Sequence, residues 1–370
     1  MAMEKQKVLV TRSSMPSLEE YIDEIEPIFK NAWMTNMGPI HEKLEEQLKK
    51  RLKSPNISLF VNGHLALSIA IKSLRLTGEV ITTPFSFAST AHAIMDNGLI
   101  PVFCDIDPDT YTIDSKKIEA LINKRTTAIV AVHVYGNVCD VEAIEAIAKK
   151  YKLKVIYDAA HAFNVEVNGV GIGSFGDFSM FSFHATKVFN TIEGGALTYK
   201  DEKMKLLLNN LKNFGITSPV NVEDIGTNAK MNEFQAAMGI CNLRHLDEEL
   251  KKREAVVKRY REHLDNIAGI KLNGLQKGVK TNHAYFPVLF DPLVFEKDRD
   301  QVAAELAEEK IFARKYFYPL INDYECYRTI YSSTATPVAK KIANQVITLP
   351  LFADLPLETV DGICGIILRK

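Results

Sequence analysis

Residues 178–200, FSMFSFHATKVFNTIEGGALTYK, place one lysine, Lys187, between two apolar segments that have the composition of buried strands. Lysine is among the residues least often found inside proteins. The ordinary explanation is a side chain whose aliphatic stem lies along apolar surface while its ammonium reaches water. The functional explanation is an amine held inside the protein for chemistry. The rest of the sequence is needed to choose between the two.

Upstream of this segment, short apolar runs alternate with longer amphipathic stretches. The apolar runs predict strands at residues 57–61, 79–83, 100–106, 127–134 and 153–159. The amphipathic stretches predict helices at residues 64–74, 88–97, 114–123 and 140–151. This alternation indicates βαβ units and a mostly parallel central sheet that is buried on both faces.

The pattern changes near residue 176. Between residues 176 and 199 two strand-like pieces follow one another without a helix-length segment between them, and a charged helical pattern then covers residues 232–264. Strands and helices mix beyond it. The fold class is therefore α/β. We predict a large α/β domain over residues 1–240, and a connecting helix with a smaller C-terminal α+β domain over residues 241–370.

Composition narrows the classes of function. The 370 residues are 46% hydrophobic and 25% charged, with a net charge of −1. Because there is no basic surplus, we expect no nucleic-acid or membrane partner. The N-terminal stretch MAMEKQKVLVTRSS has no apolar signal core, and no run approaches the roughly 20 apolar residues that span a bilayer. A cytoplasmic location is expected.

The cysteines support the same compartment. They are odd in number and widely spaced, which favours neither a disulfide framework nor a metal-binding pair. They are Cys104, Cys139, Cys241, Cys326 and Cys364. We expect each to be a reduced, buried filler of the core and expect no metal site.

In open α/β sheets a ligand binds beyond the carboxyl ends of the strands. The residues that follow the predicted strands therefore form the candidate site. They are Asn62-Gly63-His64 and the stretches 83–87, 133–136, 158–161 and 182–187. A lysine, an aspartate, histidines, an aromatic ring and a glycine turn that opens a helix would converge on one cleft.

One motif in the chain is misleading. Residues 171–176 spell GIGSFG, a literal G-x-G-x-x-G, but the dinucleotide-binding motif needs a strand before it and a helix after it. Here it follows the turn-like VNGV and precedes another predicted strand. Asn62-Gly63-His64 is a better phosphate seat, because backbone amides at a helix N-terminus bind phosphate without a cation. A plain glycine turn is the alternative.

Each remaining candidate has a functional and an ordinary explanation. Asp158 could keep a heterocyclic nitrogen protonated, or could be the N-cap of a following helix. Pyridoxal phosphate needs such a carboxylate, a lysine and a phosphate seat. Phe87 could stack on the ring or pack in the core. His161 could contact the ring's phenolic oxygen or be a hydrogen-bonded cleft histidine. Ser182 could donate to the phosphate or simply end a strand.

These residues lie in an ordered set of motifs that resembles a known family. The set comprises WMTNMGPIHEKLEEQL (33–48), NGHLALSIA (62–70), TTPFSFAST (82–90), PVFCDID (101–107), HVYGNVCD (133–140), VIYDAAHAF (155–163), FSFHATKVFNTIEGGAL (181–197), IGTNAKMNEFQAA (225–237) and ARKYFYPL (313–320). Over roughly residues 8–368 the chain resembles the sugar aminotransferases of the DegT/DnrJ/StrS group. These are pyridoxal-phosphate enzymes of fold type I, which is aspartate aminotransferase-like.

The resemblance implies a role for each matching residue. Lys187 corresponds to the Schiff-base lysine, Asp158 to the partner of the pyridinium nitrogen, His161 to the neighbour of the phenolic oxygen and Phe87 to the ring stack. The implied phosphate seat consists of Gly63, His64 and Ser182. The asparagine of the family's G-x-N-x-R/K-M segment, here Asn228, reaches the cofactor of the partner subunit, which implies a homodimer with shared active sites.

Two departures from the family pattern matter. Many members have S-G-T where this chain has Asn62-Gly63-His64, so a threonine hydroxyl is lost and the seat depends on backbone amides. Lys230 stands where arginine is common, and an ammonium cannot replace a bidentate guanidinium on an anion. This departure affects the docking of a carboxylate or a pyrophosphate.

The implied reaction is a ping-pong transamination. L-glutamate would donate an amino group to the cofactor, and a nucleotide-linked keto sugar would accept it. NGH, FHATKVFNTIEGGAL and KNFGI most resemble the subgroup that aminates C4 of a dTDP-4-keto-6-deoxyhexose, in O-antigen or other glycan or natural-product synthesis. Amination at C3 is the alternative. Candidate sugar-side residues are His184, Lys230, Tyr316 and Tyr318, and the alternative for the histidine and the tyrosines is packing.

Two other classes are less compatible with the sequence. Sugar dehydratases of the same fold replace the lysine with histidine, and Lys187 argues against them. A non-catalytic sensor on this fold would be expected to carry an added binding segment, and nothing basic is appended. The functional explanation of Lys187 is favoured, because desolvation makes the amine easier to hold neutral and available as a base.

Overall fold

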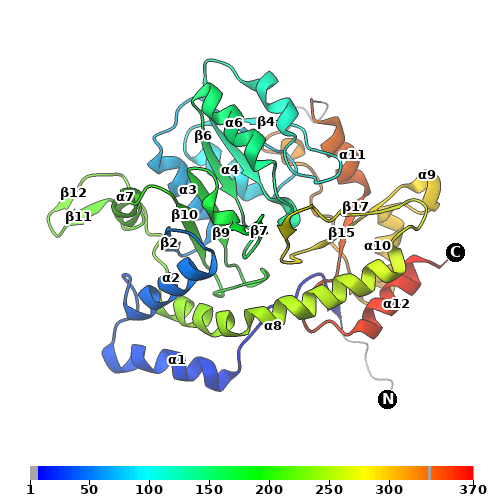
Figure 1. The fold of residues 1–370 in the computed structure, drawn as a ribbon, viewed down its shortest axis with the longest axis horizontal. Helices are drawn as coiled ribbons and strands as arrows, with labels where there is room; N and C mark the ends of the chain where they lie inside the picture. The colour runs from blue at the N-terminus through cyan, green and yellow to red at the C-terminus, as the bar shows by residue number, and fades with distance from the viewer. Residues whose placement is uncertain (1–6, 332–334, 370) are drawn as a thin grey trace.

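A seven-stranded sheet forms the centre of the computed structural model, which describes residues 7–331 and 335–369 (Figure 1). Residues 1–6 of the N-terminal stretch discussed above lie outside the described residues. The strand order is β2-β10-β9-β6-β5-β3-β4. The strands are β2 (Asn56–Phe60), β10 (Gly195–Tyr199), β9 (Phe178–Ser182), β6 (Lys154–Asp158), β5 (Thr126–Val132), β3 (Glu79–Thr82) and β4 (Ile100–Phe103). β10 is antiparallel to both of its neighbours, and the other pairs are parallel, so the predicted mostly parallel sheet is confirmed.

Helices cover both faces of this sheet. One face packs against α3 (Gly63–Ser73), α4 (Ala88–Asp96) and α7 (Met204–Leu211). The other packs against α2 (Pro39–Arg51), α6 (Val141–Tyr151) and α8 (Glu233–Leu264). Neighbouring residues of β6 serve opposite faces, because Ile156 packs with the first set while Val155 and Tyr157 pack with the second. Burial on both faces explains the continuous apolar runs of the sequence.

The predicted helices at 64–74, 88–97 and 140–151 correspond to α3, α4 and α6. The predicted helix at 114–123 is shorter than expected, because only α5 (Ser115–Ile118) and a 3₁₀ turn, η1 (Glu119–Leu121), form there. Ile118 is the one residue of these two pieces that is buried. Most helical stability in proteins comes from packing an apolar face, and this segment has too little of one to extend further.

The long helix α8 is confirmed and connects the two parts of the chain. It begins with a capping box, in which the Asn232 side chain accepts from the Gln235 amide (2.9 Å) and the Gln235 side chain accepts from the Asn232 amide (3.1 Å). Its first half packs under the large sheet and its second half against α12 (Leu357–Ile367). In Figure 1 it crosses the molecule from the large sheet to the C-terminal elements.

The C-terminal part is α+β, as predicted. Its antiparallel sheet has the order β13-β15-β17 and shares a core with α10, α12 and the end of α8. The elements are β13 (Ile270–Leu272), β15 (Phe286–Phe290), β17 (Val346–Leu349), α9 (Pro292–Phe295), α10 (Arg299–Glu308), η4 (Ile321–Asp323) and α11 (Pro337–Gln345). A short strand near the N-terminus, β1 (Val8–Leu9), pairs with β16 (Ile311–Phe312) of this part. The expected division after residue 240 falls inside α8 and stays a prediction.

The remaining elements lie around the large sheet. β14 (Val279–Lys280), β7 (Glu166–Val167) and β8 (Val170–Gly171) form a small sheet, and two 3₁₀ turns are η2 (Val134–Gly136) and η3 (Ile172–Ser174). Helix α1 (Leu18–Asn31) packs on α8. The hairpin of β11 (Ile216–Ser218) and β12 (Asn221–Val222) projects from the body of the molecule on the left of Figure 1.

Among the described residues, no helix has both the length and the apolarity to cross a lipid bilayer. The same residues contain no group of three or more metal-ligating side chains. All five cysteines are free thiols. Four are buried, as expected of core fillers, but Cys326 is exposed, so that expectation was wrong for this residue.

The capping box of α8 gives a stability prediction. Asn232→Ala removes the acceptor of the Gln235 amide, and we expect the free energy of unfolding to fall by about 1 kcal/mol. Asn232→Asp is the matched control, because aspartate caps helices about as well. Urea titration followed by circular dichroism measures both. Equal midpoints for the alanine variant and the wild type would contradict the role of the cap.

Candidate active site

The carboxyl ends of the parallel strands bring most of the predicted residues to one edge of the large sheet. Gly63 follows β2, Asp158 and Ser182 are the last residues of β6 and β9, and Lys187 comes five residues later. The ideal Cβ of Gly63 would lie 3.0 Å from Ser182 Cβ, and the Lys187 amine interacts electrostatically with Asp158. The residues predicted from strand ends therefore meet at one edge of the sheet.

Lys187 is half-buried, and its amide donates to the His184 carbonyl (2.9 Å). Its Nζ lies 5.9 Å from the centre of the Tyr285 ring. Burial lowers the pKa of the Lys187 ammonium from 10.5 to about 8, and the nearby Asp158 and Tyr316 oppose this shift. A substantial fraction of the amine is therefore neutral near pH 8, which an ordinary surface lysine does not achieve.

Asp158 is buried but well supplied with donors. Thr90 Oγ1 donates to its Oδ2 (2.8 Å) and the Ala160 amide donates to its Oδ1 (3.1 Å). Burial raises the pKa of this carboxyl, and those two donors and the Lys187 charge partly offset the rise. No helix follows β6, because residues 159–165 form turns that lead into β7. The N-cap explanation of Asp158 is therefore wrong, and a buried carboxylate beside a cation remains.

His161 is held in a defined orientation. Its Nδ1 accepts from the Tyr135 amide (3.1 Å), so the proton of the neutral ring resides on Nε2. The ring lies parallel to Phe317 at 5.9 Å and tilted to Tyr285 at 4.8 Å. Burial, together with the Lys187 charge, lowers the pKa of His161 well below its usual range. The side chain is thus a neutral donor through Nε2.

The turn into α3 has the features of an anion seat. The Asn62 side chain caps the helix by accepting from the Leu65 amide (2.8 Å). The amides of Gly63 and His64 belong to the first turn, which has no acceptors within the helix. Gly195 passes so close that its ideal Cβ would lie 2.7 Å from the Asn62 carbonyl carbon, so glycine is required there.

The side chain of His64 is engaged elsewhere. Its Nδ1 lies 2.9 Å from Ser89 Oγ and its Nε2 lies 3.5 Å from an Asp96 carboxylate oxygen, both on α4. What His64 can offer a phosphate is its backbone amide. This agrees with the expectation that the seat depends on amides where many relatives have a threonine hydroxyl.

Phe87 is the N-cap residue of α4, and 61% of it is exposed. The core-packing explanation is wrong for this ring, because the fully buried Phe85 occupies the core position instead. Ser182 is partly exposed at the end of β9 and pairs with Gly195. Both side chains are accessible to a ligand at this edge of the sheet.

The four sugar-side candidates lie in different settings. His184 Nδ1 lies 2.8 Å from Thr186 Oγ1, and Lys230 Nζ donates to Asn213. The Tyr316 carbonyl accepts from the Tyr135 hydroxyl, and Tyr316 contacts Tyr285 edge-on at 5.9 Å. Tyr318 is 48% exposed and lies under the Arg299 guanidinium at 4.2 Å. Of the two tyrosines, Tyr316 interacts electrostatically with the Lys187 amine.

Sequence reasoning assigned no role to four residues that shape the site, although one of them, Tyr135, lies in the candidate stretch 133–136. Thr90 binds Asp158, and Asn282 Nδ2 donates to the carbonyls of His161 and Phe163 (both 2.9 Å). Tyr135 orients His161 through its amide, and Tyr285 lies against Lys187. Thr90 and Tyr135 belong to motifs quoted above, but Asn282 and Tyr285 come from the C-terminal part, where the sequence offered no strand-end rule.

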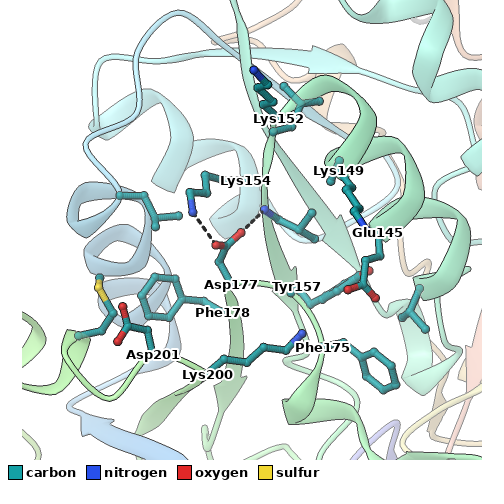
Figure 2. A pocket seen from close by; sticks show the side chains of 17 residues that line it. Glu145, Lys149, Lys152, Lys154, Tyr157, Phe175, Asp177, Phe178, Lys200 and Asp201 are labelled. Carbon is teal, nitrogen blue, oxygen red and sulfur yellow. Dashed lines mark hydrogen bonds and ion pairs between the residues drawn. The ribbon is translucent and has the colours of Figure 1, made fainter.

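Two features elsewhere do not belong to this site. GIGSFG begins at the last residue of β8, contains the 3₁₀ turn η3 and is followed by β9, so no α-helix N-terminus accompanies it. A hollow of about 570 Å³ lies at the amino ends of β6 and β9. Figure 2 shows the side chains that line it, with Asp177 bound to Lys154. That edge of the sheet is opposite to the one that holds Asp158 and Lys187.

The candidate site fits pyridoxal 5′-phosphate. A glycine-lined helix N-terminus suits the phosphate, and Asp158 suits a protonated ring nitrogen. The exposed Phe87 ring suits stacking, and Lys187 provides the amine. The arrangement is that of a pyridoxal-phosphate enzyme of the transaminase class.

Comparison with known proteins gives the family. Residues 17–368 match the model of the DegT/DnrJ/EryC1/StrS aminotransferase family, and the chain belongs to this family. Its cofactor is pyridoxal phosphate. The chain is 45% identical to a dTDP-4-amino-4,6-dideoxy-D-glucose transaminase of Shigella dysenteriae, covering 99% of both chains, and 42% identical to an Escherichia coli transaminase of the same name, covering 100% of both.

Solved structures agree with this assignment. DesI, crystallised in the presence of its TDP-sugar product, superimposes with a TM-score of 0.94 at 32% identity, covering 99% of this chain and 93% of that one. Helicobacter pylori PseC, an aminotransferase involved in the biosynthesis of pseudaminic acid, gives 0.91 at 27% identity over 98% of each chain. The expected fold type is thereby confirmed.

The coupling between Lys187 and Asp158 can be measured. Asp158→Asn removes a negative charge that raises the pKa of Lys187, so we expect that pKa to fall further below about 8. The rate at which an anhydride acetylates Lys187 in cofactor-free protein, followed by peptide mass spectrometry from about pH 6 to about pH 10, reports this pKa. Exposed lysines in the same digest are the reference. An unchanged or higher pKa in the variant would show that the two groups do not interact.

Proposed function

We propose that the protein transfers an amino group from L-glutamate to C4 of a dTDP-4-keto-6-deoxyhexose, giving a dTDP-4-amino-4,6-dideoxyglucose-type product. The observation that carries this proposal is the desolvated Lys187 amine beside the buried Asp158 carboxylate, in a chain 45% and 42% identical to transaminases named for that sugar. The product would enter O-antigen or another glycan or natural-product pathway.

The alternatives have less support. A relative named as a 3-aminotransferase is 32% identical, so amination at C3 ranks second. A dehydratase is disfavoured by Lys187 itself. A non-catalytic sensor would have no use for an amine whose pKa is lowered to about 8.

The cofactor, when bound, supplies a ring that accepts electrons from the bonds around the reacting carbon. Asp158 would hold the proton on the ring nitrogen, because an ion pair with a buried carboxylate favours the charged ring. His161 would donate through Nε2 to the phenolic oxygen. Gly63, His64 and Ser182 would bind the phosphate, and Phe87 would fix the ring plane. Lys187 Nζ would take a proton from the donor's Cα and deliver it to the carbon on the other side of the transferred nitrogen.

The surface of the chain supports a homodimer with shared sites. Asn228 is exposed, and its backbone pairs with Asn213 at the base of the β11–β12 hairpin. That projecting hairpin exposes apolar side chains, among them Val220 at 96% and Val222 at 64%, and Ile225, just after it, is 85% exposed. Helix α1 and the loop after it expose a second apolar set: Leu18, Ile22, Phe29, Trp33 and Met34. Apolar patches of this kind mark association surfaces, and a second copy is the occupant we propose.

The free cysteines support a reducing, cytoplasmic compartment for the reaction. In the proposed dimer Asn228 would complete the cofactor site of the partner subunit. Lys230, two residues later, would face the same site as one of the sugar-side residues together with His184, Tyr316 and Tyr318.

The activity is tested directly with the proposed substrates. With L-glutamate and dTDP-4-keto-6-deoxyglucose we expect a product that carries an amine at C4, identified by mass spectrometry and NMR. Lys187→Ala should retain cofactor and lose turnover, because the anchor and the proton-transferring amine are the same group. Borohydride should fix the pyridoxyl group on Lys187. Lys124→Ala, at an exposed position, is the control.

Amination at C3 in that assay would select the alternative. Failure to aminate any nucleotide-linked keto sugar, with the cofactor bound, would contradict the proposed function.

The shared site is tested by subunit mixing. Asn228→Ala should weaken cofactor binding by about 1–3 kcal/mol, through loss of a hydrogen bond to a charged group, so that it is inactive at limiting cofactor. A heterodimer of Lys187→Ala and Asn228→Ala chains has one site with both lesions and one with neither. We therefore expect partial return of activity. Heterodimers confirmed by native mass spectrometry that stay inactive would rule out the exchange of Asn228.

A further inference from the structure

Arg314 has a fixed backbone next to the candidate site. Its amide donates to the Thr348 carbonyl (3.1 Å), and its carbonyl accepts from both the amide (2.7 Å) and the hydroxyl (3.0 Å) of Thr348. Thr348 is a fully buried residue of β17. The guanidinium therefore projects from a rigid point of the small sheet and not from a loose surface loop.

In the described part of the chain, the Arg314 guanidinium has no paired carboxylate of the kind that the neighbouring cations Lys315 and Arg299 have. Lys315 Nζ and Arg299 Nε both bind the Asp300 carboxylate, at 2.8 and 2.9 Å. Within residues 7–331 and 335–369, Arg314 has no carboxylate at ion-pair distance; its Nη1 donates to the Tyr316 hydroxyl (2.7 Å), and the guanidinium lies 5.6 Å from the Tyr316 ring. Its side chain is exposed, so its other N–H groups are accessible.

Two tyrosines connect this cation to Lys187. Tyr316 binds the guanidinium through its hydroxyl and interacts electrostatically with the Lys187 amine. Tyr285 packs edge-on against Tyr316, and its ring centre lies 5.9 Å from Lys187 Nζ. Burial raises the pKa of Tyr285, and the Arg314 charge opposes this rise. The unpaired cation and the amine are thus on the two sides of one tyrosine pair.

We propose that Arg314 docks an anionic group of a substrate whose reacting carbon lies at Lys187. The proposal rests on the proposed transaminase function, whose two substrates carry the anions in question: the carboxylates of the amino donor and the diphosphate of the nucleotide sugar. A guanidinium presents a planar fork that fits either oxyanion with two hydrogen bonds. Lys230 cannot supply that fork, because its ammonium is a point charge.

The test measures binding and not turnover. Enzyme whose cofactor has been fixed by borohydride is titrated calorimetrically with glutarate, a dicarboxylate without an amine, and separately with dTDP. Arg314→Met should weaken the binding of at least one probe by about tenfold or more, because a charge-assisted hydrogen bond is lost. Loss for glutarate alone identifies the donor carboxylate, loss for dTDP alone identifies the diphosphate, and loss for both means that the two anions share the guanidinium.

Controls separate docking from general charge effects. Lys315→Met removes the same charge one residue away and should leave both affinities unchanged. Arg314→Lys, which keeps the charge and loses the fork, should recover only part of the lost affinity. The proposal is overturned if Arg314→Met binds both probes like the wild type, or if Lys315→Met causes an equal loss. Because this test measures no turnover, a failure of the amination assay would not change the result of the binding test.

Discussion

The opposed effects of burial and charge at Lys187 are the constraint on which the rest of the site depends. Burial favours the neutral form of the amine, while the Asp158 carboxylate favours its charged form. Neither effect alone would leave the pKa at about 8. Burial without Asp158 would lower the pKa further, and Asp158 without burial would raise it. The sheet edge must therefore hold both groups at once.

Residues outside the strands make that arrangement rigid. Thr90 reaches Asp158 from α4, Asn282 ties down the turn after β6 from the C-terminal part, and Tyr135 fixes His161. Each of these bonds joins segments that are far apart in the chain. The orientation of the site is consequently a property of both parts of the molecule, which also meet through Tyr316 and Phe317.

The strand-end rule and the helical periodicity were enough to predict the sheet, most helices and the meeting of Gly63, Asp158, Ser182 and Lys187. They succeed because parallel strands share one carboxyl edge. They could not predict Tyr285 or Asn282, because these side chains reach the site through tertiary packing, which the local periodicity of the sequence does not reveal. They overestimated the helix at 114–123, where charged residues fit the period but almost nothing is buried.

The position of β10 has a consequence for synthesis of the chain. β2 is the outermost strand of the large sheet, and its one neighbour in that sheet is β10, with Leu59 opposite Ala196. The helix turn at Gly63 comes shortly after β2. Among the described strands, β2 has no partner in the sheet until β10, which ends at Tyr199, has been synthesised. The early βαβ units can form as they emerge, while the proposed cofactor site depends on this late pairing of distant segments. A nascent chain that stops short of β10 would carry Asp158 without the strand that supports the proposed phosphate seat, so we expect the coenzyme to join only a nearly finished large domain.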